Sequence, residues 1–513
     1  MASYLNLMPT PRIPRSDANR LKGKQLALAF FTQKAPGSST WVCRCGKERI
    51  QNGSGYTNMC SHITQCHPEH LELYAGGEHN ELILRYATIP KKSKTIFDWL
   101  KWVTELLLPF SFVGNQIVRR YTNLDPISRT TFMKYLGLCT SVVEQNIREK
   151  LPDAFALVFD GWSHGSTHYV AVFATFPSDH KLGYSKILLS FAPMNDETKL
   201  TADEHIAYVE FILTTFGKDW SNVIALIGDN CPTNGKFGRM AGIPLIGCAS
   251  HRFNLAVSDY IGQSKLVAKI NTLMLKLKNL LPAAKLRQFT PLVAKTRNVT
   301  RWSSTFAMVS RYRELRPFLQ RIDDDDIAAL MLTAREDRQA DELLNSLTDL
   351  DSVTLLLQRE NLYLDEVRSV FDVVLDEDPA MANRIAPNAR TVQDPDFENC
   401  IVKILEGREF DLTPQERASA VSLLKRSATR EATTAPASTL AERAAIRMAN
   451  APAASDYMDL RFLRPTSNIC ERFFSVVKHA LSDNRSRILS KNIEAQMFLH
   501  FNAEFWTAED IAI

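Results

Sequence analysis

Several features that would restrict the environment of this chain are scarce or missing from its 513 residues. No stretch of 18 apolar residues occurs, so we expect no transmembrane helix and no membrane partner. The first residues, MASYLNLMPTPRIPRSD, lack the apolar core that a secretory signal peptide needs. The nine cysteines are scattered along the chain. Their scatter argues against a disulfide framework and favours a reducing cytosolic or nuclear compartment.

The net charge is also small for so long a chain, at +4. The whole protein is therefore not a polycation, and any surface that binds nucleic acid must be a local patch. Hydrophobic residues make up 45% of the sequence, which is ample material for a core. The length allows roughly three domains of about 150 residues each.

The N-terminal part of the chain divides into three successive segments. Residues 1–24 are polar, basic and contain proline, so we expect a flexible lead. Residues 25–75 concentrate cysteine, histidine and aromatic residues in a compact cluster. Within residues 95–150, apolar residues such as Phe97 and Leu100 recur at three- and four-residue spacing, which predicts helices.

The middle of the chain reads as an α/β domain. The segments FALVFD, THYVAVFATF and KILLSFAPM predict three consecutive strands. A helix follows over 201–217, with Thr201 as its N-cap and Glu204 in a capping-box position, and then strand, helix and strand. This order predicts a mixed sheet covered by helices, as in an RNase H-like core. Residues 262–460 read as almost entirely helical, and dense apolar sequence returns from Arg461 onward.

The cysteine and histidine cluster has the composition of a zinc site. Zinc takes four ligands in a tetrahedron, commonly a cysteine pair on a turn and a histidine pair on a helix. Cys43 and Cys45 fit the turn, with Gly46 after them, and His62 and His67 fit a helix that begins near Tyr56.

This segment resembles a BED-type zinc finger, with Phe30, Phe31 and Trp41 preceding the cysteine pair. The family spaces its cysteines two residues apart, whereas one residue separates them here. Cys60 and Cys66 are alternative ligands, Cys66 in particular together with His62, and an unmetallated core cluster is the remaining alternative. A finger of this kind would contact DNA, with phosphate-seeking charge from Lys47, Arg49, Lys22 and Lys24.

Three acidic residues stand at notable places further along. Asp160 in VFDGWS and Asp229 in LIGDNCPTN each end an apolar run, 155–159 and 223–228, that predicts a buried strand. Glu471 in SNICERFFS opens the last substantial apolar segment. If tertiary folding brings these carboxylates together, they would hold Mg²⁺ or Mn²⁺ and serve phosphodiester chemistry. Each acid taken alone is equally well explained as a turn cap or as a solvated helix residue.

Five motifs in order, DGW, DNCPTN, CASH, TRW and CERFFS, make residues 95–513 similar to the hAT superfamily of DNA transposases. The resemblance implies that Asp160, Asp229 and Glu471 are the catalytic, magnesium-binding acids. It implies that His251, Arg301 and Trp302 lie at the DNA, with the tryptophan stabilising a flipped base. It also implies an RNase H-like core over 153–302, an all-α insertion over 303–463, and a last core part with a dimerisation region over 464–513.

The family resemblance further implies a nuclear protein that binds double-stranded DNA at terminal inverted repeats and target sites. Residues 95–150 would then bind DNA or dimerise, and a homodimer or higher oligomer would form through C-terminal aromatics. The alternative is a catalytically inactive, transposase-derived DNA-binding dimer that acts as a transcriptional or chromatin regulator; a decayed product without function is the third possibility. Trp302 and most C-terminal aromatics would also fit a core. Lysines and an arginine on a leucine-rich segment fit either a solvated face or a DNA channel; they are Lys265, Lys269, Lys276, Lys278, Lys285 and Arg287.

Overall fold

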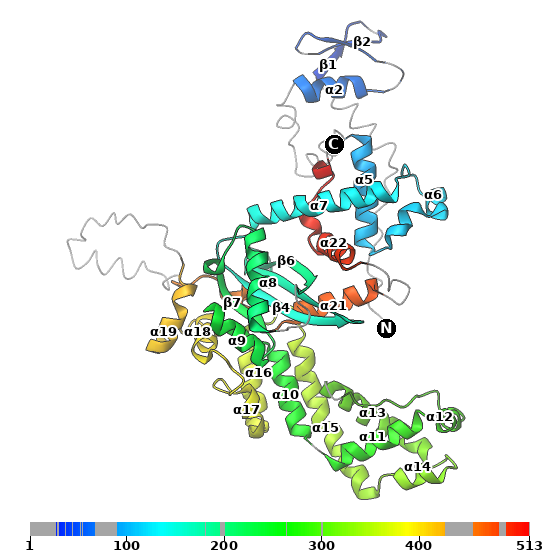
Figure 1. The fold of residues 1–513 in the computed structure, drawn as a ribbon, viewed down its shortest axis with the longest axis vertical. Coiled ribbons are helices and arrows are strands. Elements are labelled where there is room, and N and C mark those ends of the chain that lie inside the picture. Colours follow the sequence, from blue (N-terminus) through cyan, green and yellow to red (C-terminus); the bar gives the residue numbers. More distant parts are fainter. Residues whose placement is uncertain are drawn as a thin grey trace, which may run out of the picture. The chain divides into compact units, whose positions relative to one another are not determined.

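The computed structural model shows a mixed α/β protein with two β-sheets (Figure 1). Its chain forms two compact units, Met1–Asn146 with Asn502–Ile513, and Ile147–Phe501. None of the described helices is both long and apolar enough to span a membrane, and no disulfide joins the nine cysteines. The described residues are 27, 30–35, 37–43, 45–51, 53, 55–66, 90–179, 181–194, 201–262, 264–298, 301–425, 455–481 and 489–511.

The N-terminal part of the described chain, called the finger below, is a small three-stranded sheet with one helix. Strands β1 (Phe31–Gln33), β2 (Thr40–Cys43) and β3 (Glu48–Ile50) pair antiparallel in that order. Helix α2 (Thr57–Cys66) follows, at the position that the sequence predicts. Its apolar residues Met59 and Ile63, four apart and therefore on one helical face, are buried in a cluster with the aromatic residues of β1 and β2. The predicted flexible lead, 1–24, lies outside the described residues.

Helices make up the rest of the smaller unit: α5 (Lys91–Glu105), η1 (Phe110–Gly114), α6 (Gln116–Tyr121) and α7 (Arg129–Lys150). The chain end joins them through η8 (Ala503–Phe505) and η9 (Glu509–Ile511). The Trp506 ring lies edge-on to Phe97 at 5.3 Å, and the Lys101 ammonium lies 4.5 Å from the same indole. These contacts correct the prediction that 464–513 is one segment, because its last residues complete the helical core of the smaller unit.

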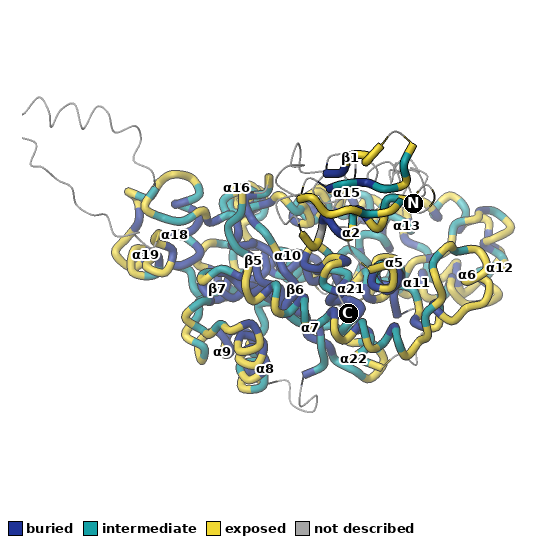
Figure 2. The backbone as a smooth tube through the Cα atoms, turned by 90° about the horizontal axis from the view of Figure 1, so that it is seen from above, coloured by how far each residue is buried: buried dark blue, intermediate teal, exposed yellow. Residues whose placement is uncertain are grey.

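The larger unit is built on a five-stranded sheet of order β6-β5-β4-β7-β8. Strands β4 (Phe155–His164), β5 (Thr167–Pro177) and β6 (Tyr184–Pro193) are antiparallel neighbours. Strands β7 (Val223–Gly228) and β8 (Leu245–Gly247) join β4 in parallel. All six residues of β7 are buried, because a parallel strand covered on both faces is apolar throughout. The same burial is visible as dark blue in Figure 2.

Four helices accompany this sheet: α8 (Ala202–Thr215), α9 (Pro232–Ala241), α21 (Asn468–Ala480) and α22 (Ser490–Phe501). The hydroxyl of Thr201 caps α8 by accepting from the Glu204 amide at 3.4 Å, as the sequence predicts. This helix ends two residues before the predicted boundary, because Gly217 adopts a positive φ of 67° that terminates it. Helix α21 packs on β4, and α22 packs on β6.

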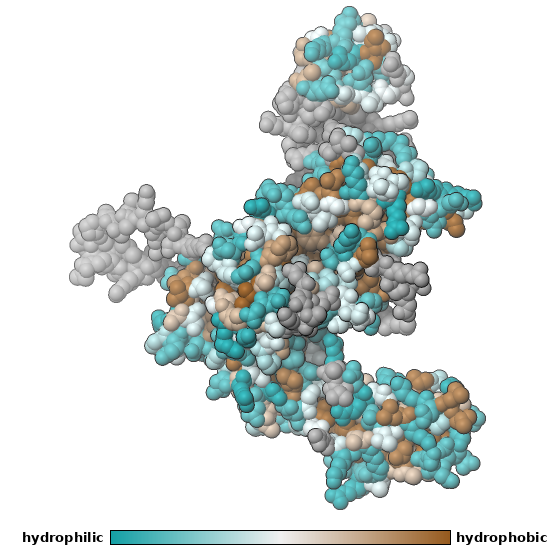
Figure 3. Space-filling model, viewed as in Figure 1, coloured by the Kyte–Doolittle hydropathy of each residue, from teal (hydrophilic) through white to brown (hydrophobic). Residues whose placement is uncertain are grey.

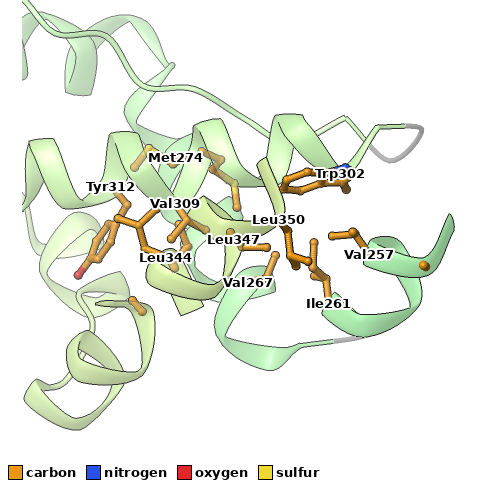
Figure 4. Packing of buried hydrophobic residues seen from close by; sticks show 14 of the residues in the cluster. Val257, Ile261, Val267, Met274, Trp302, Val309, Tyr312, Leu344, Leu347 and Leu350 are labelled. Atoms are coloured by element: carbon orange, nitrogen blue, oxygen red, sulfur yellow. The ribbon is translucent and has the colours of Figure 1, made fainter. Parts of the chain in front are cut away.

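A helical lobe forms the rest of the larger unit. Its helices are α10 (Ala249–Ile261), α11 (Lys265–Leu277), α12 (Leu280–Arg287), α13 (Trp302–Leu319), α14 (Asp325–Leu330), α15 (Ala334–Leu357) and α16 (Leu364–Glu377). They share one apolar core, in which Val257 and Ile261 of α10 lie near Leu350 of α15 (Figure 4). The predicted boundary at 303 falls within this cluster of buried residues, which includes residues on both sides of it.

The edge of the sheet at β8 is covered by side chains that follow the lobe. Helices α18 (Pro395–Leu405) and α19 (Pro414–Ser419) lie in this part of the chain, and the short 3-10 turns η4 (Glu409–Asp411), η5 (Ala420–Leu423) and η6 (Leu460–Phe462) contact α18. Helix α17 (Ala382–Ile385) and η3 (Pro379–Met381) pack on α10, and η2 (Trp220–Asn222) precedes β7. The Asp394 carboxylate accepts a hydrogen bond from the Leu245 amide at 2.8 Å, and the Glu398 carboxylate accepts one from the Gly247 amide at 3.2 Å. These carboxylates satisfy edge N–H groups that would otherwise be open to another strand.

Candidate active site and candidate metal centre

One cleft in the larger unit, of about 350 Å³, is lined by all six residues that the sequence singles out there. They are Asp160, Asp229, His251, Arg301, Trp302 and Glu471. They come from the sheet, from α10, from the start of α13 and from α21, so the cleft lies where the sheet meets the helical lobe.

Asp160 reaches the cleft from the middle of β4. The sequence predicts a strand that stops at Phe159, but β4 continues to His164 and pairs with β5, with Asp160 opposite Ala171. The polar residues beyond Phe159 are held in the strand by this hairpin, which an apolar run does not indicate. One Asp160 carboxylate oxygen accepts the Gly161 amide at 2.8 Å.

Asp229 follows β7 and is held by two asparagines of its own motif. The Asn234 amide donates to the Asp229 carbonyl at 3.0 Å, and the Asn230 amide donates to the Cys248 carbonyl at 3.3 Å. The Asn230 side chain lies against Gly247, where a Cβ atom would be only 1.8 Å from its oxygen. The spacing D-N-x-x-x-N therefore locks the turn that presents Asp229, and glycine is required opposite it.

His251 lies in the first turn of α10, whose start is fixed by the neighbouring strands. The Cys248 amide donates to the Gly228 carbonyl at 2.8 Å, so α10 begins directly beside the end of β7. His251 Nδ1 is 3.3 Å from Asp229 Oδ2. Cys248 is almost fully buried, and burial raises the pKa of its thiol to about 11, so this cysteine packs the core.

Glu471 lies in the first turn of α21, next to a carbonyl clamp. The clamp consists of Arg464, Asn468 and Arg472, which bind carbonyl oxygens at the end of α15 and in the turn after it. Arg464 donates to Glu360 and Leu362 at 2.6 and 2.7 Å, Asn468 to Leu357 at 2.8 Å, and Arg472 to Gln358 at 3.1 Å. The lobe thereby sets the position of Glu471 in the cleft.

The acids of the cleft raise one another's energy when charged. Burial raises the pKa of Asp160 to about 7, and the carboxylates of Asp229 and Glu471 act in the same direction. Burial also raises the pKa of Asp229, against the lowering effect of His251 and Arg301. The Arg301 guanidinium lies 3.7 Å from Glu471. This set of oxygen donors is therefore short of positive charge.

Trp302 lines the cleft but offers no open aromatic face. The residue is 4% exposed, and its indole points into the core of the lobe (Figure 4). Asn254 accepts the Trp302 backbone amide at 3.3 Å and so fixes the start of α13. The burial favours the core role that the sequence left open over stacking of a flipped base.

The sequence does not single out several other residues that line the cleft. Asn254 follows His251 by three residues on α10 and so shares its face, a spacing that could have indicated it. Thr354 and Gln358 reach the cleft from α15, and no local pattern marks them, because only the packing of the lobe brings that helix to the sheet.

The N-terminal cluster is a candidate metal centre. Among the residues that the structure describes, Cys43, Cys45 and His62 are the one group of three whose donor atoms all lie within 4.8 Å of one another. Cys45 Sγ is 3.3 Å from His62 Nε2, and Gly46, with a φ of 84°, closes the turn. Two thiols and an imidazole are ligands that suit zinc, so this group could hold such a metal.

This group of three, found among the described residues, contains no fourth ligand. His67 lies outside the described residues. Cys66 is the last residue of α2 and is exposed, but it does not belong to the group of three. Burial raises the pKa of the Cys60 thiol, which disfavours the thiolate that a metal requires.

The C-terminal aromatic residues are mostly part of the chain's own core. Five side chains are less than 10% exposed: Phe473, Phe474, Phe498, Phe505 and Trp506. Phe473 packs edge-on against Phe501 at 4.8 Å and against Phe191 of β6 at 4.9 Å. A contact between two copies of the chain would therefore have to use other surfaces.

Comparison of the chain with models of known protein families and with curated proteins finds no match.

Proposed function

We propose that this chain is a DNA transposase of the hAT type, a metal-dependent nuclease and strand transferase with an N-terminal DNA-binding zinc finger. The observation that carries the proposal is the meeting of Asp160, Asp229 and Glu471, far apart in sequence, at one cleft. Three antiparallel strands followed by two parallel ones support an RNase H-like core. We further propose a nuclear location and a homodimer or higher oligomer on double-stranded DNA.

The donor set fits a divalent cation. All three side chains offer carboxylate oxygens. Burial and then repulsion by the neighbouring carboxylates raise the pKa of Asp160, and a bound cation would relieve that repulsion. Mg²⁺ or Mn²⁺ bound there would supply Lewis-acid activation of a phosphate and of a water molecule. His251 would orient Asp229 and hold a proton at Nδ1 or Nε2, and Arg301 would contact a phosphate oxygen.

A second candidate is an inactive, transposase-derived DNA-binding dimer that regulates transcription or chromatin. One observation favours this candidate. Among the described residues, Asp160, Asp229 and Glu471 do not form a group whose donor atoms all lie within 4.8 Å of one another. The contact of Glu471 with Arg301 also provides the glutamate with a cation from the protein itself.

The two candidates are separated by cleavage of duplex DNA from the two flanks of the gene, where the proposed function places the inverted repeats, with Mg²⁺ or Mn²⁺ present. We expect the full chain to nick or hairpin this DNA, and Asp160→Asn or Asp229→Asn to abolish the reaction. Calorimetry should show Mn²⁺ binding by the wild type that either variant weakens. A wild type that binds the DNA but neither cleaves it nor binds Mn²⁺ at the cleft would establish the inactive alternative.

A further inference from the structure

The basic residues of 265–301 fall into two groups, according to whether a carboxylate accompanies them. Lys269 pairs with Glu336 at 2.7 Å, Lys285 pairs with Asp324 at 3.1 Å, and Lys276 pairs with Asp326. These pairs join α11 and α12 to α14 and α15, so their charges are neutralised within the lobe.

Five other cations of the same region, Lys265, Lys278, Arg287, Lys295 and Arg297, have no such partner among the described residues. Three of these five lie on the turn after α11 and within residues 295–297. Lys278, Lys295 and Arg297 make no ion pair with an acid in the described part of the chain; the Lys278 ammonium lies 3.4 Å from the Thr296 hydroxyl. Lys278 and Lys295 are exposed, and Arg297 is half-buried. We call these three residues the basic strip.

Two hydrogen bonds hold the basic strip in place beside α11. The Arg297 amide donates to Asn271 of α11 at 3.3 Å, and Lys278, which directly follows α11, donates to the Thr296 hydroxyl. The side of α11 that faces the basic strip is therefore different from the side that carries Lys269 and Lys276. Figure 3 shows this end of the lobe, around α12, as a mixture of hydrophilic and hydrophobic residues.

The basic strip leads to the cleft. The Asn298 amide donates to the Ser304 hydroxyl at 2.7 Å, and the same hydroxyl donates to the Asn298 carbonyl at 2.8 Å. Ser304 belongs to the first turn of α13, whose Arg301, Trp302 and Ser303 line the cleft. The segment that carries Lys295 and Arg297 thus leads to Arg301, which is 68% exposed and lies 3.7 Å from Glu471 in the cleft.

We propose that Lys278, Lys295 and Arg297 bind the phosphate backbone of the DNA whose scissile phosphate lies in the cleft. The inference rests on the proposed function and extends it to a surface of the lobe. Unpaired cations beside an acidic cleft suit a polyanionic partner. The cations attract its phosphates, and a metal ion bound by the acids would attract the same strand. Exposed Leu275 and Val293 beside it would face sugars rather than phosphates.

The test is the salt dependence of DNA binding by the full, zinc-loaded chain, without Mg²⁺ or Mn²⁺. A fluorescent duplex carrying the inverted repeats is titrated at several salt concentrations, and log K is plotted against log [salt]. Each lost phosphate contact reduces the slope by about 0.9. We expect the triple variant Lys278→Ala, Lys295→Ala, Arg297→Ala to have a slope smaller by roughly two to three, with weaker binding to all sequences.

The matched control is Lys269→Ala, Lys276→Ala, Lys285→Ala, which removes the same charge from the same lobe. We expect its slope to equal that of the wild type, because those lysines are engaged by acids. The zinc finger is common to all three proteins, so its phosphate contacts cancel in the comparison. Circular dichroism verifies that each variant is folded, and single substitutions replace any triple variant that is not.

Three contradicting outcomes can be told apart. If the wild type binds no duplex, the proposed function itself fails. If the wild type binds but the strip variant keeps its slope, the basic strip is not a phosphate-binding surface and the proposed function stands. If polyglutamate binds the wild type as tightly as the duplex does and loses affinity in the strip variant while DNA does not, the surface docks an acidic protein, and the proposal is overturned.

Discussion

At the scale of single residues, the cleft depends on small side chains that leave no room for substitution. Asn230 is held between Gly247 and the Cys248 carbonyl, and its side-chain oxygen is buried without a hydrogen-bond partner. The Asn230 side chain cannot rotate away from Gly247 without losing its hydrogen bond to the Cys248 carbonyl. Asp229 is the next residue along the chain, so the position of this carboxylate depends on Gly247.

We predict that Gly247→Ala displaces Asn230 and with it Asp229, because the new Cβ would lie 1.8 Å from the amide oxygen. The free energy of unfolding should fall by about 1–3 kcal/mol, as for other overpacked cores, and Mn²⁺ should bind more weakly. Thermal unfolding and calorimetry measure the two effects. Gly137→Ala in α7 is the control: its Cβ meets nothing within 4 Å, and stability should be unchanged or rise by up to about 1 kcal/mol. Equal melting of Gly247→Ala and wild type would refute the prediction.

Glu494 of α22 makes stability depend on pH. Burial raises the pKa of this carboxyl from 4.5 to about 7 in the folded chain. The folded state therefore prefers the protonated form, and its contribution to stability is complete below pH 4.5 and lost as the pH rises through 7. We predict that Glu494→Gln raises the melting temperature relative to wild type at pH 8 and leaves it unchanged at pH 4. A difference that is the same at both pH values would show that the carboxyl does not titrate as described.

At the scale of elements, the end of α15 and the start of α21 are joined by the carbonyl clamp. Asn468 and Arg472 lie four positions apart on α21 and Arg464 precedes this helix, and all three donate to backbone carbonyls within residues 357–362. Arg464 and Asn468 are both buried. The carbonyl groups at a helix end lack intrahelical partners, so the clamp satisfies them and fixes Glu471 at the same time.

We predict that Asn468→Ala costs about 1–3 kcal/mol of stability, because the buried Leu357 carbonyl loses its donor. Mn²⁺ binding should weaken as well, since Glu471 is no longer held in register. The comparison is Ser475→Ala, which lies on the same helix and bonds only its own backbone, at the Glu471 carbonyl. If both variants lower Mn²⁺ affinity equally, the effect belongs to the helix as a whole and not to the clamp.

At the scale of the whole molecule, the finger and the larger unit have separate cores. The finger is a small sheet and a helix around a few apolar residues, too little to be stable without additional links. A bound metal would supply that link, because ligand binding and folding are then the same process.

We predict that Cys45→Ser removes bound zinc and increases hydrogen exchange in 31–66, while strands β4 to β8 keep their protection. Metal analysis and hydrogen-exchange mass spectrometry measure the two quantities. The wild type treated with a chelator should behave like the variant. Zinc that remains bound in Cys45→Ser would show that Cys45 is not a ligand.

Much of the local structure could be predicted because its causes are local. Apolar runs indicated β4 to β8, Thr201 indicated the start of α8, and the cysteine and histidine cluster indicated a turn followed by a helix. The sequence also singled out six residues that line the cleft, but it missed others there, among them Asn254 and the residues of α15. It did not indicate that residues on both sides of position 303 share one core, or that the residues after 501 group with the smaller unit.

The sequence by itself determined which elements form and which acids, thiols and imidazoles the chain can offer, since capping, periodicity and ligand chemistry act over a few residues. Only the tertiary structure decided that Asp160, Asp229 and Glu471 face one cleft, and that Trp302 is buried. It alone separated the lysines with carboxylate partners from those without. These outcomes depend on how the lobe packs against the sheet, and packing joins residues whose distance along the chain carries no information about their distance in space.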